Sequence, residues 1–237
     1  MNLKKIKSYY LAIHSVPKEI KSKINQLNNR RAFRNSLGKK DIFLVSYPRS
    51  GTTWTRTLIG NYLELLENPD AAKMTEHNSK RVPTINHLTE NIRKGTLAFL
   101  PPELSGKFKS NRFFSLHAPH DPIYPKVVYT VRDPRAVTVS YFHFLRYTGK
   151  IDLNLNLKSF VKQNHYYMVP WDVHVEGWLK HPSNSLLIVK YEEMIASSTE
   201  ILNRLLFFAG MKPDHEKILF AAQAADFKKI RAERELN

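Results

Sequence analysis

Residues 42–54 have the sequence IFLVSYPRSGTTW, and this stretch indicates more about the fold than any other. Its apolar start, residues 42–45, is typical of a buried strand in a parallel sheet. After the polar loop around Gly51, apolar residues recur at three- and four-residue intervals, which predicts a helix. These residues are Trp54, Leu58, Ile59, Tyr62, Leu63 and Leu66. A helix that begins in this way presents unpaired backbone N–H groups at the positive end of its dipole. The stretch therefore predicts an anion site.

The side chains of this loop suit a phosphate group. Arg49 supplies a fixed positive charge, and hydroxyl groups come from Ser50, Thr52 and Thr53. The loop of nucleoside triphosphatases, G-x-x-x-x-G-K-[ST], places a Lys and a Mg²⁺-binding hydroxyl after its second Gly. Here there is one Gly, no Gly-Lys pair, and a Trp directly after the hydroxyls. We therefore expect a phosphate site of another type. The alternative is an ordinary strand–turn–helix connection with a chance Gly and a chance Arg.

A second informative stretch is KVVYTVRDPRAVTVSYFHF, residues 126–144. Residues 127–131 form a β-branched run typical of a central parallel strand, and Pro134 suits the first turn of a helix. Arg132 would then stand at the carboxyl end of the strand, where open α/β sheets bind ligands. Ser140 follows about two helical turns later, so it could contact the same anion. The alternative is a surface pair of Arg132 with Asp133 and a solvent-exposed Ser140.

Strand patterns alternate with helical stretches along the 237 residues, at residues 42–45, 112–116, 126–131 and 185–189. This alternation predicts a single α/β domain with a mainly parallel, doubly wound sheet and a P-loop-like strand–loop–helix site. A hydrophobic fraction of 42% is enough for one core of this size. We expect residues 1–40 to form a basic arm packed on a domain of residues 41–237.

Four segments together resemble the cytosolic-type sulfotransferase family. Residues 47–54 (YPRSGTTW) resemble its Y-P-K-S-G-T-T-W signature, which is the most specific of the four. Residues 131–134 with 139–144 resemble its second signature, which holds the 3′-phosphate of the nucleotide. Trp171 with residues 174–178 is similar to the family's W-x-x-H-V-x-x-W segment, and residues 189–194 are similar to its Y-E-D-M strand end. The four segments occur in the family's order, within residues 41–234.

The resemblance implies a donor and a place for each of its parts. The donor is 3′-phosphoadenosine 5′-phosphosulfate, and the product is adenosine 3′,5′-bisphosphate. Trp54 would stack on the adenine, and Tyr191 would also approach the base. Arg132 and Ser140 would bind the 3′-phosphate, which distinguishes this donor from ATP. The 5′-phosphosulfate would contact the backbone and hydroxyls of Ser50, Gly51, Thr52 and Thr53.

The resemblance also implies two catalytic residues. Arg49 stands where the family usually has Lys, and its guanidinium would stabilise charge on the bridging oxygen as the sulfuryl group leaves. Residues 113–119 (FFSLHAP) match the family's K-T-H-L-P stretch, which makes His117 the general base for the acceptor proton. An imidazole with a pKa near ~6.5 suits this step at neutral pH. His120 is the alternative base, and Ser115 stands where the family often has a Lys that assists transfer.

The resemblance weakens at the end of the sequence. Family members usually carry a late R-K-G-x-x-G-D-W segment that folds over the nucleotide, and this sequence reaches Asn237 without it. We therefore expect the segment that covers the nucleotide to be absent. Arg231 and Arg234, or the basic arm, would then close the site differently, or the donor would bind less tightly and exchange faster.

Charge and composition narrow the partners and the location. The 37 Lys and Arg against 21 Asp and Glu give a formal net charge of +16, which favours anionic ligands. Many of these cations lie in residues 1–40, either as a solvated helix face or in weak contact with anionic surfaces. Without Cys there is neither a disulfide nor a thiolate metal site, and the scattered His residues predict no catalytic metal. No apolar run approaches the roughly 20 residues of a membrane span, and no signal peptide is evident. We expect a cytoplasmic protein without a transmembrane segment.

These patterns predict a sulfotransferase that moves a sulfuryl group to a hydroxyl or amine of a small-molecule or glycan acceptor by in-line transfer. One alternative is a P-loop nucleotide kinase that uses ATP, for which Asp133 is a candidate metal ligand. Another is a non-enzymatic basic protein that binds nucleotides or nucleic acid, with its 11% aromatic residues among cations on one surface. A third is a relative that binds the nucleotide without catalysis. Because the most specific residues converge on one small-anion site, we expect no nucleic-acid partner.

Overall fold

The computed structural model describes residues 37–68, 76–85, 112–163 and 169–225, with a few positions between 27 and 35. The chain divides into two compact units, residues 1–37 with 87–107 and residues 38–86 with 108–237. The sheet and the site residues belong to the second unit. The basic arm expected for residues 1–40 lies mostly outside the described residues, and so do Arg231 and Arg234.

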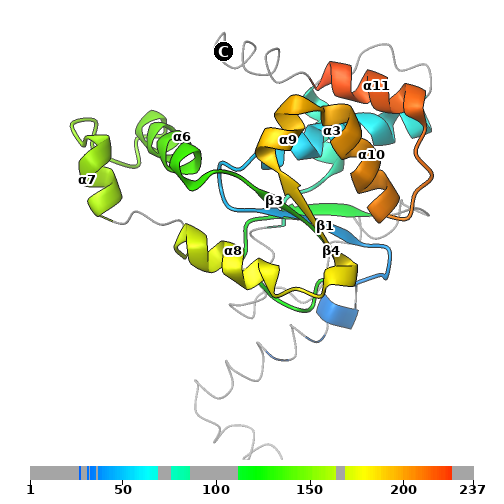
Figure 1. The fold of residues 1–237 in the computed structure, drawn as a ribbon, viewed down its shortest axis with the longest axis horizontal. Helices are drawn as coiled ribbons and strands as arrows, with labels where there is room; N and C mark the ends of the chain where they lie inside the picture. The colour runs from blue at the N-terminus through cyan, green and yellow to red at the C-terminus, as the bar shows by residue number, and fades with distance from the viewer. Residues whose placement is uncertain are drawn as a thin grey trace, which may run out of the picture. The chain divides into compact units, whose positions relative to one another are not determined.

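Four parallel strands form the sheet in the order β2-β1-β3-β4. They are β1 (Ile42–Ser46), β2 (Phe113–Leu116), β3 (Lys126–Val131) and β4 (Leu186–Lys190), each within one residue of the strand that the sequence predicts. Every residue of β1 and β2 is buried. Strand β1 lies inside a sheet that is covered on both faces, whereas β2 ends the strand order and is flanked by Thr84, which forms a bridge with Ser115. The predicted α/β class with a parallel sheet is confirmed (Figure 1).

Helices cover both faces of this sheet (Figure 1). Successive residues of β3 point to opposite faces: Val128 packs in the main apolar cluster with Leu58 and Leu202, whereas the ring of Tyr129 stacks on Trp178 at 6.1 Å. The sheet is therefore doubly wound, as the sequence predicts. The helices that lie wholly within the described residues are α3 (Thr52–Glu67), α6 (Pro134–Tyr147), α7 (Leu157–Lys162), α8 (Trp171–Leu179), α9 (Tyr191–Ala196), α10 (Ser198–Phe208) and α11 (His215–Ala224). Two short 3₁₀ helices are η1 (Glu76–Arg81) and η2 (Ser183–Ser185).

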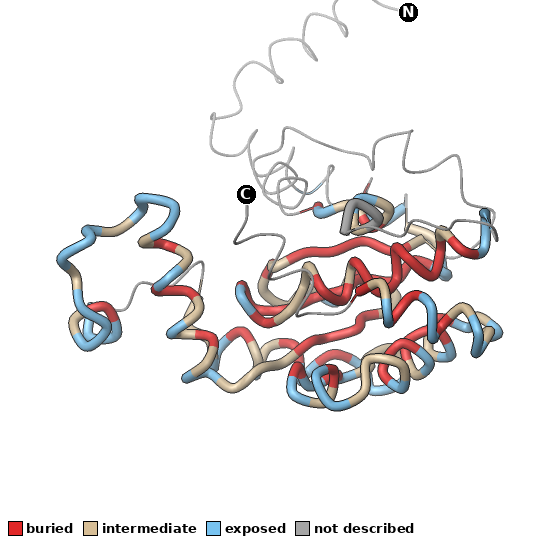
Figure 2. The backbone as a smooth tube through the Cα atoms, turned by 90° about the horizontal axis from the view of Figure 1, so that it is seen from above, coloured by how far each residue is buried: buried red, intermediate tan, exposed pale blue. Residues whose placement is uncertain are grey.

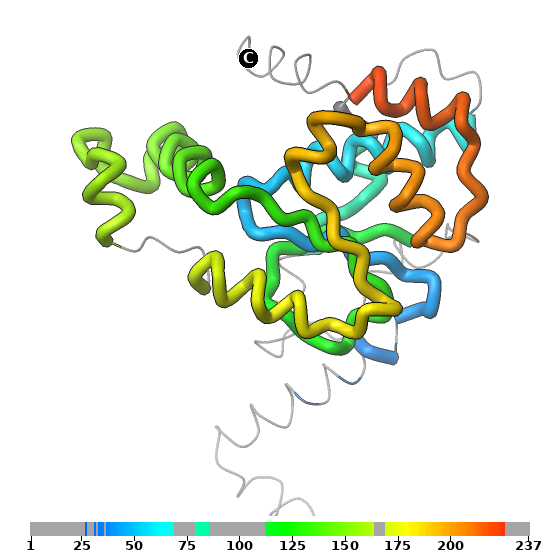
Figure 3. The backbone as a smooth tube through the Cα atoms, in the orientation of Figure 1, coloured from blue at the N-terminus to red at the C-terminus, as the bar shows by residue number. Residues whose placement is uncertain are grey.

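The order of the strands brings distant parts of the chain together (Figure 3). Ile42 of β1 pairs with Phe113 of β2 on one side and with Lys126 of β3 on the other. The carboxyl ends of β1, β2 and β3 therefore lie at one edge of the sheet. The loops that follow these strands carry the residues that the sequence singles out, at the place where such sheets bind ligands.

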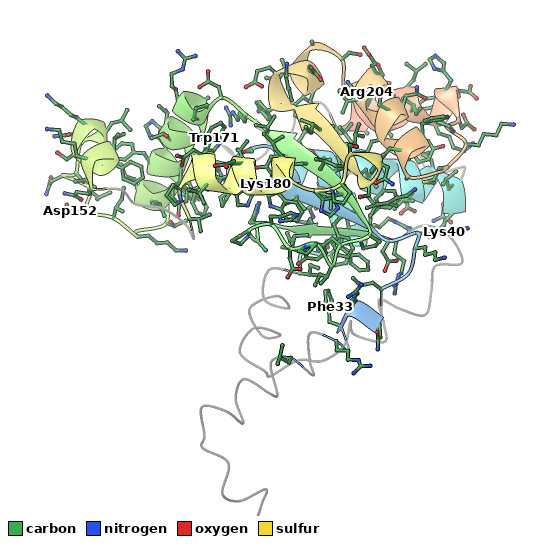
Figure 4. The ribbon with its side chains drawn as sticks, turned by 60° about the horizontal axis from the view of Figure 1, so that its bottom comes forward. Phe33, Lys40, Asp152, Trp171, Lys180 and Arg204 are labelled. Carbon is green, nitrogen blue, oxygen red and sulfur yellow. The ribbon has the colours of Figure 1, made fainter. Side chains whose placement is uncertain are left out.

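Helices α6 and α7 stand apart from the helices that cover the sheet, as Figures 1 and 2 agree. They pack on each other through a small apolar cluster that contains Tyr141, Phe142, Leu145 and Phe160. Asp133 caps the N-terminus of α6 by accepting from the backbone N–H of Arg135, and Pro134 occupies the first turn as predicted. In Figure 4 the label of Asp152 marks the outer end of this pair.

A short segment extends the sheet beyond β2. Thr84 forms a parallel bridge with Ser115, while the N–H of Ile85 donates to the Ser115 carbonyl at 2.8 Å. Arg56 of α3 holds the preceding residues, since its guanidinium donates to the carbonyls of Val82 at 2.7 Å and Ser79 at 2.9 Å. Within the described part of the chain, no helix combines the length and the apolar character needed to cross a membrane.

Candidate active site

The loop between β1 and α3 has an unusual backbone that only a few residue types allow. Gly51, the N-cap of α3, has φ 101°, and Arg49 has φ 70°. A Cβ atom at Gly51 would lie 2.6 Å from Cδ2 of Tyr191, so glycine is required here both for its backbone angle and for space. Among the described residues no side chain caps α3, which leaves the first N–H groups of the helix available to an anion.

Two buried polar atoms at this loop lack a partner among the described residues. They are the hydroxyl oxygen of Ser50, which is fully buried, and Nε of Arg132. Buried polar groups are normally hydrogen-bonded, so an unpaired hydroxyl and guanidinium N–H at one place indicate a missing ligand. Thr52, in the first turn of α3, is hydrogen-bonded through its hydroxyl to the hydroxyl of Ser46. The donors and the charge at this place fit a phosphorylated nucleotide.

The two informative stretches of the sequence meet at this loop. Arg132, just after β3, donates from Nη1 to the carbonyl of Arg49 at 2.9 Å. The guanidinium of Arg49 in turn donates from Nε to the Ser140 hydroxyl on α6 at 3.2 Å, and it lies 4.9 Å from the ring centre of Phe144. Arg49, Arg132 and Ser140 are therefore neighbours. The hydrogen bond of Arg49 with Ser140 is a contact that the sequence does not predict.

Two aromatic residues border the loop from the sheet side. Tyr191 lies at the end of β4, and its ring centre is 4.2 Å from the Arg132 guanidinium carbon. Trp54 meets Tyr191 edge to face at 5.8 Å and donates from its indole N–H to the Ala225 carbonyl at 2.8 Å. Only 8% of Trp54 is exposed, because most of its ring belongs to the main apolar cluster.

His117 follows β2 and reaches the same loop. Its Nδ1 lies 2.7 Å from the carbonyl oxygen of Ser46, the last residue of β1. Because a carbonyl only accepts, Nδ1 carries the proton, and Nε2 of the neutral ring keeps its lone pair. Burial lowers the pKa of His117 below its usual value, with the nearby Arg56 acting in the same direction and the bond to Ser46 opposing both. The ring is therefore neutral at physiological pH.

His120, the alternative base, lies against another part of the fold. Its Nε2 is 3.3 Å from Nδ1 of His181, and its ring meets Trp178 edge to face at 5.2 Å. These contacts hold it at the end of α8, whereas His117 contacts the residue that ends β1. Ser115, which stands at the position of the family's Lys, is buried and hydrogen-bonded to the Thr84 hydroxyl at 2.9 Å.

Several residues that shape this site have no role predicted from the sequence. Ser46 supplies the carbonyl that orients His117, and Arg56 lies close enough to lower the pKa of that base. His174, part of the W-x-x-H-V-x-x-W segment, donates to the backbone that follows β2. His174 lies four residues before Trp178, and this spacing on a helix predicts that the two side chains lie on the same face. In the described ranges no three His, Asp or Glu residues are grouped as a metal would require.

This fold and site define an α/β protein with a P-loop-like anion site at the carboxyl edge of a parallel sheet. The model of the family described as "Sulfotransferase domain" matches residues 39–237. The chain belongs to this family, which confirms the resemblance drawn from the sequence.

Named relatives agree with this assignment. The chain is 29% identical to luciferin sulfotransferase of Photinus pyralis, over 90% of this chain and 63% of that protein. It is 30% identical to cytosolic sulfotransferase 1 of Danio rerio, over 75% of this chain and 62% of the relative. The chain thus spans somewhat less than two thirds of the length of these relatives.

Solved structures show the same fold. The structure of retinol dehydratase in a complex with retinol and PAP matches with a TM-score of 0.63 and 27% identity, over 86% of this chain and 70% of that chain. A mouse sulfotransferase complexed with PAP also has a TM-score of 0.63, at 24% identity, over 88% of this chain and 71% of that chain. Neither the kinase nor the nucleic-acid alternative is favoured by these matches.

Proposed function

We propose that the protein transfers a sulfuryl group from 3′-phosphoadenosine 5′-phosphosulfate to a hydroxyl or amine of an acceptor, by direct in-line transfer. One observation carries the proposal: the loop at Gly51, Arg132 and His117 come from three different strands and meet at one edge of the sheet. Family membership and the PAP bound in the two matched structures support the same donor.

The residues around the loop suit the two anionic ends of this donor. We assign the 5′-phosphosulfate to the backbone N–H groups at the start of α3 and to the hydroxyls of Ser50, Thr52 and Thr53. We assign the 3′-phosphate to Arg132, whose Nε is buried without a described partner, and to Ser140. AMP lacks the 3′-phosphate, so Arg132 is the residue expected to discriminate against it.

The aromatic pair suits the adenine. Tyr191 lies beside Arg132, and Trp54 lies edge to face with Tyr191. We assign the base to a site bordered by these rings. Because Trp54 is mostly buried, its contribution is one edge of that site rather than a broad stacking face. The guanidinium of Arg49 adds positive charge near the start of α3, where it would stabilise the negative charge that develops on the leaving phosphate.

His117 is proposed as the general base. With its proton on Nδ1 bound to the Ser46 carbonyl, Nε2 is the nitrogen that accepts the acceptor's proton. The acceptor oxygen or nitrogen then forms its bond to sulfur while the bond from sulfur to the bridging oxygen breaks, and that oxygen keeps the electron pair. The lowered pKa of His117 keeps the base unprotonated before reaction. We do not assign a role in transfer to Ser115, since its hydroxyl bonds Thr84.

We propose a small-molecule acceptor and a cytoplasmic location. One relative is named for luciferin, one matched structure is a retinol dehydratase in a complex with retinol, and another relative is named cytosolic. A glycan acceptor is the second possibility from the sequence. Weak contact of residues 1–40 with anionic surfaces stays a prediction.

A transfer assay with ³⁵S-labelled donor, run over phenols, steroids, amines and glycans, tests the activity and identifies the acceptor class. Calorimetry on the same protein should show that adenosine 3′,5′-bisphosphate binds at least tenfold more tightly than AMP or ATP. Equal affinity for AMP would remove the assigned role of Arg132. Transfer to none of these acceptors, with tight bisphosphate binding, would leave the third alternative, a protein that binds the nucleotide without catalysis.

A further inference from the structure

A buried histidine on α8 contacts the backbone of the proposed base. Only 2% of His174 is exposed, and its Nε2 lies 3.2 Å from the carbonyl oxygen of His117 and 3.0 Å from that of Ala118. Its Nδ1 lies 2.9 Å from the hydroxyl of Tyr129, on the central strand β3. Figure 4 shows α8 running beside the sheet, with Trp171 at its start and Lys180 just after its end.

These contacts fix the protonation state of His174. Both carbonyls can only accept, so Nε2 carries the proton and donates to them. Nδ1 of the neutral ring is then an acceptor, and the Tyr129 hydroxyl donates to it. Burial lowers the pKa of His174 to about 4, although the two carbonyl bonds oppose that shift, so the ring is neutral at physiological pH. A single tautomer in a single orientation satisfies all three contacts.

The ring of His174 links three parts of the site. It is anchored to the middle of the sheet by Tyr129, and it packs edge to face against Tyr47 of the phosphate loop at 5.4 Å. Its bond to the His117 carbonyl restrains the backbone from which the imidazole of the base projects. Trp178, one turn later on α8, also donates to the Ala118 carbonyl, at 3.0 Å.

We propose that His174 is a positioning residue for the base: its Nε2–H holds the His117 carbonyl so that Nδ1 of His117 stays on Ser46 and Nε2 faces the acceptor. This inference rests on the proposed function. The energetic reason is that a general base works only within hydrogen-bond reach of the proton, and a displacement of about 1 Å can cost roughly a hundredfold in rate.

Two substitutions of similar size separate positioning from simple packing. In His174→Gln the amide N–H₂ reaches the place of Nε2, so the donor to the carbonyls is retained. In His174→Asn the shorter side chain can accept from Tyr129 but no longer donates to the His117 carbonyl, and the Ala118 carbonyl keeps the Trp178 donor. We expect kcat to fall about tenfold to a hundredfold in the Asn variant and less than threefold in the Gln variant. The Kd for adenosine 3′,5′-bisphosphate should be unchanged in both, because His174 touches none of the nucleotide-binding residues assigned above. Equal losses in the two variants would overturn the proposal.

A double-mutant cycle tests whether His174 acts through the base. If it does, His174→Asn should cause almost no further loss of kcat in a protein that already carries His117→Ala. If the fold-losses in kcat of the two single variants multiply in the double variant, His174 acts independently of His117. That result would contradict the inference and would not affect the proposed function. If the wild-type protein transfers no sulfuryl group, the proposed function fails, and the cycle is replaced by a measurement that needs no activity.

That measurement is the imidazole tautomer, from long-range ¹H–¹⁵N spectra of the wild-type protein. His174 should be protonated on Nε2 and His117 on Nδ1, each as a single tautomer. In His174→Asn, His117 should become a mixture of tautomers, whereas in His174→Gln it should stay protonated on Nδ1. A His117 tautomer that is the same in both variants would contradict the proposal. A wild-type His174 protonated on Nδ1 would also contradict it, and that result needs no variant.

Discussion

The nucleotide side and the base side of this site are built in different ways. On the nucleotide side, each functional residue sits in or beside a local motif, such as the loop at Gly51 or the end of β3 at Arg132. On the base side, the orientation of His117 depends on the Ser46 carbonyl of one strand and on His174 of a distant helix. Anion binding therefore follows from short stretches of sequence, whereas the geometry of proton transfer depends on tertiary contacts.

This difference predicts which substitutions affect which step. Changes at the loop and at the end of β3 should alter nucleotide affinity, while changes around His117 should alter kcat alone. A variant that lowered both equally would show that the two sides are coupled more tightly than their contacts indicate.

The largest expected effect is on the base side. His117→Ala should lower kcat by about a hundredfold to ten-thousandfold, the range for removing a general base, and leave the Kd for adenosine 3′,5′-bisphosphate nearly unchanged. The labelled-donor assay and calorimetry measure these two quantities. His120→Ala is the matched control, because His120 contacts His181 and Trp178 and not the phosphate loop. Activity that survives the first change but not the second would reverse the assignment of the base.

The next effect is on the nucleotide side, at Gly51. Gly51→Ala places a Cβ 2.6 Å from the Tyr191 ring at φ 101°, so the loop or the ring must move. We expect nucleotide affinity to fall about tenfold or more, with a further loss of stability of about 1–2 kcal/mol from the left-handed backbone alone. Gly210→Ala is the control, since it has φ 77° but no atom within 4 Å of the added methyl. It should lower the Tm through a similar backbone strain and leave the nucleotide affinity unchanged. Equal nucleotide affinity in the two variants would contradict the proposed site.

A smaller and more selective effect is expected at Arg132. Arg132→Ala should weaken binding of adenosine 3′,5′-bisphosphate about tenfold to a hundredfold, the usual range for a lost charged hydrogen bond. AMP binding should change little, because AMP lacks the 3′-phosphate. Calorimetry with both nucleotides gives the comparison, and a parallel loss for AMP would mean that Arg132 acts by supporting the loop through the Arg49 carbonyl instead.

The smallest effect is a change in pH dependence. His117 acts as a base only when neutral, and burial lowers its pKa below the usual value near ~6.5. Activity should therefore fall with decreasing pH through a midpoint that lies below this usual value. A profile of kcat/KM between pH 5 and pH 8 checks this. A midpoint above ~6.5 would contradict the buried state of the base.

Much of the fold and of the nucleotide side could be predicted from the sequence, because the signals there are local. The apolar run of β1 and the β-branched run of β3 predict buried parallel strands, and Pro134 marks the start of α6. The juxtaposition of Arg49, Arg132 and Ser140 followed from the rule that ligands bind at the carboxyl edge of such sheets.

The rest of the site depends on the directions of side chains, which no short sequence pattern predicts. Nothing in the sequence distinguishes His117 from His120 except the family resemblance, and the difference appears only as contacts with Ser46 and with His181. The hydrogen bond from the Arg49 guanidinium to the Ser140 hydroxyl joins a loop to a helix and follows from no short pattern, while the assignment of Arg49 to the bridging oxygen stays a prediction. Trp54 stays assigned to the adenine, and its N–H bond to Ala225 and its place in the apolar cluster are contacts that the sequence does not predict.

The parallel pairing of β1 with two strands from much later in the chain has a consequence for folding. The phosphate loop is synthesised before Arg132 and Tyr191, although its backbone contacts both of these residues. Chains rich in such non-local pairings fold slowly, on a timescale of about milliseconds to seconds. A nascent chain that ends at β2 would therefore not bind the nucleotide. Nucleotide present in the cell would stabilise the fold only at the last stage of folding.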